Sequence, residues 1–279
     1  MRTANVVVSV LGVAALVVAG VLAFRWRRSA LIVVRPSVPE SSGRAALNAL
    51  RTLAVATTSG VIAGVLVPGL GGRFVMRVLA ATSGDVAQGK FTDANETVGD
   101  ITVDGTIGVV VFVGLLGGLL AALGFVVLRR WLPTTAGPAG LIAGVLLLGT
   151  IGVSDAMSPD NADFAILHPT WLAVALIVFL ALLFGVTFTA LAARLDAGMA
   201  TLGRRLSSIA GHASLVFLAI PPLVIGAVAY VAGRATLRGR LEPVLARPAV
   251  RRIGHVVVGV AVVLAAVNSV RAIVEIAEA

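Results

Sequence analysis

The feature that most constrains this chain is a series of long apolar segments separated by short polar ones. An α-helix needs about 20 apolar residues to cross about 30 Å of hydrocarbon, and seven segments come close to or exceed that length. They are residues 5–24, 52–72, 105–128, 136–153, 170–193, 213–233 and 253–270. Only 13% of the residues are charged, against about 25% in soluble domains. The sequence therefore predicts an integral membrane protein.

The predicted fold class is all-α, a polytopic bundle of about seven transmembrane helices. We expect one membrane domain over residues 1–279, with 5–24 as an N-terminal anchor span and 52–270 as the core bundle. Glycine pairs four residues apart let helix backbones approach closely. They favour tight packing within one bundle, with dimerisation as the alternative: Gly60 and Gly64, Gly114 and Gly118, Gly140 and Gly144.

Arginines at the ends of the apolar segments predict how the chain is oriented. A single arginine, Arg2, precedes the first segment, whereas Arg25, Arg27 and Arg28 follow it. Since a secretory signal peptide has its charge in front and a cleavage site behind, this segment reads as a retained span. Cytoplasmic loops are enriched in arginine, so the N-terminus is predicted outside a bacterial cytoplasmic membrane. The same placement explains the net charge of +9 without nucleic-acid binding.

The loops predicted to lie outside are acidic, as this orientation requires. The two outer loops, 73–104 and 154–169, contain few basic residues (Arg73, Arg77 and Lys90) and many acids: Asp85, Asp93, Glu96, Asp100, Asp104, Asp155, Asp160 and Asp163. The stretch QGKFTDANETVGDITVDGT, residues 88–106, predicts a small outer loop or β-hairpin.

The last two apolar segments, 213–233 and 253–270, do not follow the enrichment of arginine in cytoplasmic loops. If 213–233 crosses the membrane, six arginines lie outside: Arg234, Arg238, Arg240, Arg247, Arg251 and Arg252. A re-entrant or interfacial segment, with six crossings in all, would return them to the cytoplasm. Because irregular backbone at membrane depth must be covered by protein, we expect seven crossings, with a kink at Pro221–Pro222 and a cytoplasmic C-terminus.

Arg73 and Arg77 are one helical turn apart, directly after the second apolar segment. Apolar residues occupy the other side of this turn, which predicts a short interfacial helix beginning after Pro68 and Gly69. Its arginines would face lipid phosphates or the acids of the next loop. The alternative is a pair that binds an anion or positions a substrate, for which the planar guanidinium is suited.

Metal and cofactor chemistry has few candidates in this sequence. The chain has no cysteine, which excludes disulfides and thiolate metal sites. Asp155, Asp160 and Asp163 lie near His168, and their carboxylates suit a divalent cation, although a solvated loop explains them as well. His212 and His255 would lie on opposite faces if both last segments cross. No metal site and no cofactor is predicted.

The succession GGRFVMR, QGKFTDANETVGDITVDGT, LRRWLP and SVRAIVEIA resembles an uncharacterised family of multi-spanning membrane proteins from GC-rich bacteria. The resemblance extends from residue 52 to the C-terminus, with the first span as an addition. The family has no established function, so the resemblance implies architecture only.

The spans contain almost no ionisable residue, which argues against a proton-coupled transporter or an intramembrane hydrolase. We therefore expect a non-catalytic accessory or scaffold subunit, whose partners are the lipid bilayer and other membrane subunits. A channel or carrier for a small solute is one alternative, suggested by prolines within spans. A membrane enzyme using Arg73 and Arg77 at the outer face is the other.

Overall fold

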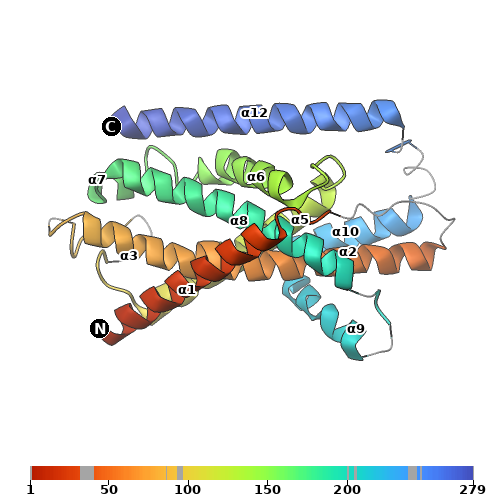
Figure 1. The fold of residues 1–279 in the computed structure, drawn as a ribbon, viewed down its shortest axis with the longest axis horizontal. Helices are drawn as coiled ribbons and strands as arrows, with labels where there is room; N and C mark the ends of the chain where they lie inside the picture. Colours follow the sequence, from red (N-terminus) through yellow and green to blue (C-terminus); the bar gives the residue numbers. More distant parts are fainter. Residues whose placement is uncertain are drawn as a thin grey trace.

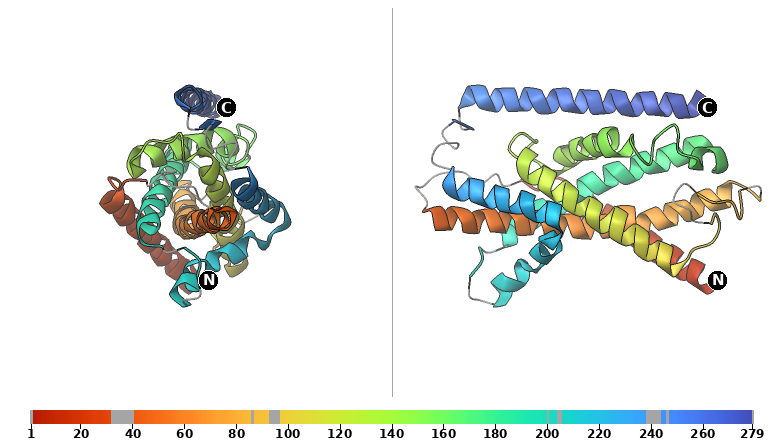
Figure 2. Two further views of the ribbon diagram at one scale, coloured as in Figure 1. Left: turned by 90° about the vertical axis from the view of Figure 1, so that its right-hand side faces the viewer. Right: turned by 180° about the vertical axis from the view of Figure 1, so that it is seen from behind.

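The computed structural model describes residues 2–31, 41–85, 87–92, 97–199, 201–203, 206–237, 244–245 and 247–278. Helices lie side by side along one long axis (Figures 1 and 2). The α-helices are α1 (Arg2–Trp26), α2 (Ser42–Gly64), α3 (Gly72–Thr82), α4 (Val103–Gly108), α5 (Gly117–Leu128), α6 (Ala136–Leu147), α7 (Asp163–Ile166), α8 (Thr170–Gly198), α9 (Leu206–Gly211), α10 (Pro221–Thr236) and α12 (Pro248–Glu278). Three π-helical segments and one 3₁₀ segment continue or connect them: η1 (Val65–Gly71), η2 (Val109–Leu116), η3 (Leu148–Gly152) and η4 (Ala213–Ala219).

Within the residues that the structure describes, five helices are long and apolar enough to cross a membrane: Val6–Trp26, Ser42–Thr82, Val103–Leu128, Thr170–Gly198 and Pro248–Glu278. A sixth apolar helix, Ala136–Gly152, is shorter. The protein is thus an all-α, multi-pass membrane protein, as predicted. The apolar faces of the outermost helices remain exposed, for example Val17 of α1 and Val256 of α12, as expected of side chains that contact lipid.

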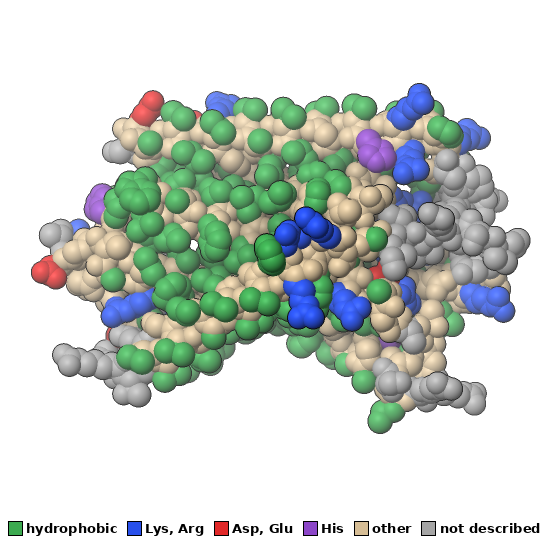
Figure 3. Space-filling model, in the orientation of Figure 1, with side chains coloured by type: hydrophobic (Ala, Val, Ile, Leu, Met, Phe, Trp, Pro, Cys, Tyr) green, Lys and Arg blue, Asp and Glu red, His purple; other side chains and the backbone are tan. Residues whose placement is uncertain are grey.

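The two ends of the bundle differ in charge. We call the end toward which α1, α5 and α8 run and at which α2 and α12 begin the arginine-rich end, although α1 finishes nearer the middle of the long axis (Figure 1). The arginines on this side are Arg25, Arg27, Arg28, Arg44, Arg51, Arg129, Arg130, Arg194, Arg251 and Arg252. The acidic end holds both termini, the end of α3, and α7 (Figure 1). In the space-filling view, hydrophobic side chains cover much of the surface between the ends, and Lys or Arg side chains also lie near the middle of this face (Figure 3).

Residues 213–233 do not form the predicted kinked crossing helix. They divide into η4 and α10, with extended backbone at Ile220 between them. Both parts pack against α2, and α10 ends beside the arginine-rich end, where Tyr230 and Arg234 interact electrostatically with Arg129. The α12 helix then starts from that same end (Figures 1 and 2). The segment therefore turns back, as in the alternative with six crossings.

Polar and apolar contacts both hold this turned-back segment against the bundle. The Ser214 hydroxyl of η4 lies 2.8 Å from the hydroxyls of Thr57 and Thr58 on α2. Leu218 and Leu223 are buried in the main hydrophobic core. Residues 219–222 between these two leucines are exposed, so the segment packs on the bundle through one side only.

The interfacial helix predicted around Arg73 is also corrected. Helix α3 is the end of one continuous 41-residue helix, Ser42–Thr82, rather than a separate segment. Pro68 lacks an N–H and crowds the preceding turn, and it lies inside the wider π-helical turn η1, which lets the helix continue. The predicted outer hairpin is present in small form, with a single antiparallel bridge between Phe91 and Thr97. Asp93 to Glu96, also part of that prediction, lie outside the described residues.

Glycines place the helices of the bundle in direct backbone contact. A Cβ added to Gly60 would lie 2.2 Å from the Gly118 carbonyl oxygen, and one on Gly64 would lie 2.0 Å from that of Gly114. A Cβ on Gly185 of α8 would likewise lie 2.2 Å from the Gly140 carbonyl oxygen of α6. The predicted packing of these glycines within one bundle is confirmed.

Candidate functional site

A small cavity lies at the acidic end, between α3, the loop that follows it and α7. Its volume is about 90 Å³, and its charged lining residues are Arg73, Arg77, Asp100 and Asp163. Arg77 is half-buried, and Arg73 is only 4% exposed, which is unusual for an arginine. The predicted arginine pair thus faces a pocket within the protein.

The loop that covers the arginines is fixed by hydrogen bonds to α3. Arg77 Nη1 donates to the Gly99 carbonyl oxygen at 3.3 Å, and Gln88 Nε2 donates to the Ala80 carbonyl oxygen at 2.7 Å. Gly99 has a φ of 88°, and a Cβ there would lie 1.9 Å from Gln88 Oε1. Both the backbone conformation and the close approach require glycine at this position.

The opposite side of α3 packs on protein. Val75 and Leu79 form a buried cluster with Val98 of the loop and with Leu167 and Ala173 near the start of α8. The pattern that predicted an amphipathic helix at the membrane surface therefore arises from a helix end whose arginines line a pocket and whose apolar residues join an adjacent small core. Val98 and Leu167 belong to both.

The remaining predicted acids do not join this pocket. Asp155 and Asp160 are exposed and do not line it, whereas Asp163 does. In the part of the chain that the structure describes, no three His, Asp or Glu side chains are grouped so that they could hold a metal ion. Asp100 was not predicted as a site residue, and its only signal in the sequence was its place in the acidic loop after the arginine pair.

Chemically, the pocket combines two guanidinium groups with two carboxylates. Its volume is well below the roughly 300–1,000 Å³ of sites that enclose drug-sized ligands. The arrangement suits water or a very small polar molecule.

An ion pair at the arginine-rich end was missed by the sequence analysis. Arg51 Nη1 lies 2.7 Å from Asp196 Oδ1, its Nε donates to the Met199 carbonyl oxygen at 2.6 Å, and its Nη2 donates to the Asp196 carbonyl oxygen. This three-point contact joins α2 to the end of α8. A signal was present, because Asp196 directly follows an apolar span among arginines.

Arg129, the residue after α5, lies close to this pair. Burial lowers the pKa of the Arg129 guanidinium, an effect opposed by Tyr230 and Asp196. Since an arginine side chain does not lose its proton in proteins, Arg129 carries a positive charge. Among the described residues of this end, Asp196 is the one acid available to both guanidinium groups.

No protein-family model, no curated protein and no solved structure matches this chain. The resemblance described above stays a prediction, and what the chain does has to be inferred from its own residues.

Arg77→Gln is expected to loosen the loop over the pocket. The substitution removes the hydrogen bond to the Gly99 carbonyl oxygen, and a single such bond contributes about 1 kcal/mol. Amide hydrogen exchange at Val98 and Asp100 should therefore be about fivefold faster. Lys90→Gln, an exposed change in the same loop, is the matched control and should leave exchange unchanged. Equal exchange in Arg77→Gln and the unmodified protein would contradict this role for Arg77.

Proposed function

We propose that the chain crosses the cytoplasmic membrane of a bacterium six times and has both termini outside. The crossing segments are α1, the continuous helix Ser42–Thr82, the continuous helix Val103–Leu128, α6 with η3, α8 and α12. With six crossings, the arginines between α8 and α12 lie on the same side of the membrane as the other arginines of the arginine-rich end. The bias of arginine toward the cytoplasm then holds for every connection, which supports this orientation.

In that membrane we propose a non-catalytic role, as an accessory or scaffold protein of a membrane assembly. The observation that carries the proposal is the direct contact of helix backbones at three places in the bundle. At Gly60–Gly118, Gly64–Gly114 and Gly140–Gly185, helix backbones meet with no room for even a methyl group. A solute path between these helices would need side chains or water at those positions.

The buried hydroxyls support the same conclusion. Thr57 and Ser59 of α2 donate to carbonyl oxygens of their own helix. Thr189 of α8 donates to the Ala136 and Gly185 carbonyl oxygens at 2.8 and 2.9 Å. These hydroxyls donate to backbone carbonyl oxygens, and Thr57 also contacts the Ser214 hydroxyl, so their hydrogen bonds are made within the protein rather than with a solute.

A carrier for a small solute is the second candidate, and one observation favours it. The π-helical segments η1 and η2 pack against each other, and π-helical turns within α-helices are frequent at functional sites. Pro68 within η1 gives this region a means of changing shape.

Flux and co-purification together distinguish the two functions. In vesicles containing the purified protein, we expect permeability to water, glycerol and urea equal to that of protein-free vesicles. Vesicles with a known water channel serve as the positive control. Extraction of the tagged chain from its native membrane in mild detergent should yield a partner in fixed stoichiometry by native mass spectrometry. Solute flux above the protein-free level, or a chain that is always extracted alone, would contradict the scaffold role.

A further inference from the structure

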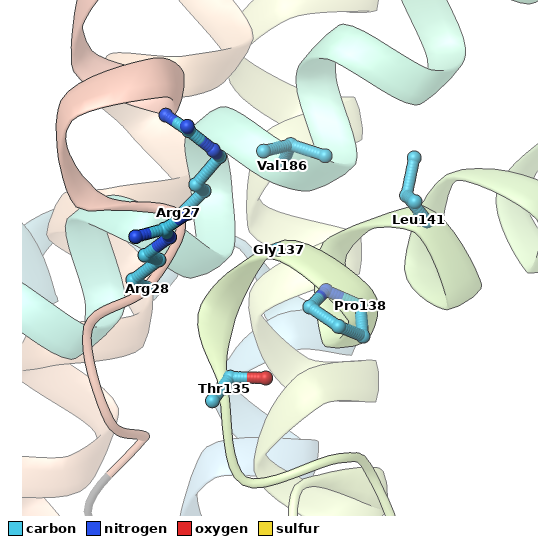
Figure 4. A pocket seen from close by; sticks show the side chains of 7 residues that line it. All are labelled: Arg27, Arg28, Thr135, Gly137, Pro138, Leu141 and Val186. Atoms are coloured by element: carbon cyan, nitrogen blue, oxygen red, sulfur yellow. The ribbon is translucent and has the colours of Figure 1, made fainter.

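A second, larger cavity opens at the arginine-rich end, between the end of α1, the start of α6 and the middle of α8. It is an open groove of about 720 Å³. Figure 4 shows Arg27 and Arg28 on one side of the groove, Thr135 and Pro138 at its base, and Leu141 and Val186 farther along. None of its lining residues is an acid.

The backbone around the groove is held firmly. The Gly137 N–H donates to the Arg27 carbonyl oxygen at 2.7 Å, and the Leu31 N–H donates to the Thr134 carbonyl oxygen at 2.8 Å. An isolated bridge joins Ala30 to Thr135. The end of α1 and the start of α6 thus form one unit, and these backbone N–H and carbonyl groups are already hydrogen-bonded to each other.

Arg27 is held in position above this unit. Its guanidinium lies 3.7 Å from the centre of the Phe24 ring, and its Nη1 donates to the Phe24 carbonyl oxygen. A guanidinium fixed in this way keeps other N–H groups for a ligand at little entropic cost. Arg28 is the neighbouring residue, is exposed, and adds a second positive charge at the same edge.

The groove changes from charged to apolar along its length. Leu141 lies six residues beyond Thr135 on α6, about 9 Å along the helix axis, and its side chain is 48% exposed on the outside of the bundle. Lipid phosphates lie level with the ends of transmembrane helices, and acyl chains lie beside their apolar surface. The charged edge and the apolar part of this groove match that arrangement.

We propose that this groove binds an anionic phospholipid, with its phosphate at Arg27 and Arg28 and the first part of an acyl chain along Leu141 and Val186. The positive edge without any acid selects a lipid with net negative charge over a zwitterionic one. The volume of about 720 Å³ exceeds what a free phosphate needs and suits a phosphoglycerol group with several methylene groups.

Native mass spectrometry of the delipidated protein in detergent tests this proposal. Phosphatidylglycerol and phosphatidylcholine with the same acyl chains are titrated separately. We expect the first phosphatidylglycerol to bind about tenfold more tightly than phosphatidylcholine. The double variant Arg27→Gln/Arg28→Gln should lose that preference and keep its affinity for phosphatidylcholine. Arg251→Gln/Arg252→Gln, an exposed pair at the same end on α12, is the matched control and should keep the preference.

Two further experiments show whether the bound anion is a lipid or free phosphate, and where the acyl chain lies. Millimolar inorganic phosphate should not displace phosphatidylglycerol, whereas displacement would indicate a site for free phosphate and overturn the proposal. Leu141→Trp, at an exposed position, should weaken both lipids severalfold with an unchanged thermal midpoint. Equal affinity for the two lipids in the unmodified protein, or an unchanged preference in the Arg27/Arg28 variant, would also overturn it.

Discussion

Gly118→Leu is expected to abolish the folded bundle, whereas Gly117→Leu on the same helix should leave it intact. A Cβ on Gly118 would lie 2.1 Å from the Gly60 carbonyl oxygen and 2.7 Å from its carbonyl carbon. Both atoms belong to the backbone, so no change of rotamer relieves the overlap and α5 must move away from α2. Overpacking of a core typically costs about 1–3 kcal/mol, and separating two helix backbones along their contact should cost more than about 3 kcal/mol.

The neighbouring glycine provides the control for this experiment. A Cβ on Gly117 would meet no atom within 4 Å, so a side chain there begins in open space. The measurements are the folded yield by size-exclusion chromatography and the unfolding midpoint from the fluorescence of the three tryptophans. Similar midpoints for the two variants would show that the α2–α5 contact is not as close as described.

Asp196→Asn is the second change with a large expected effect. Asp196 is 7% exposed and is the carboxylate that pairs with Arg51 at 2.7 Å. Its removal leaves the positive charges of Arg51 and Arg129 in a poorly hydrated position. Breaking a buried pair from one side costs about 3–5 kcal/mol. Because the Arg51 side chain is 18% exposed, we expect about 2–3 kcal/mol.

A double-mutant cycle separates the interaction energy between Arg51 and Asp196 from the interactions that each makes with other residues. Arg51→Gln combined with Asp196→Asn removes both charges and should recover part of the stability lost in Asp196→Asn alone. Asp160→Asn, an exposed acid at the other end, is the control and should change the unfolding midpoint little. An Asp196→Asn variant as stable as this control would refute the role of the ion pair.

The membrane helices were predictable because a span is a local property of the sequence. About 20 apolar residues suffice to define it, and the spans before residue 200 correspond to helices at the predicted places. The path of residues 213–233, in contrast, could not be predicted from their length and apolar content alone. Pro221–Pro222 were interpreted as a kink within a span, yet they occupy the first turn of α10, where proline is favoured. Ile220 before them is extended, as a residue before proline prefers.

The site residues show a similar division between local and distant information. The sequence indicated that Arg73 and Arg77 share one side of a helix, which the structure confirms. It could not show that residues 97–101 fold over them, because that contact depends on Gly99 and Gln88 rather than on any periodic pattern. Asp196 was overlooked because its partner, Arg51, lies 145 residues away in the chain.

The central claim is that residues 213–236 enter and leave at the arginine-rich end, so that the chain crosses the membrane six times. Reporters fused after residue 279 and, separately, after Leu237 test it most directly in intact cells. With six crossings, alkaline phosphatase is active and green fluorescent protein is dark after residue 279, and the reverse holds after Leu237. A fluorescent fusion after residue 279, together with an active phosphatase after Leu237, would mean that the segment crosses the membrane and would contradict this account.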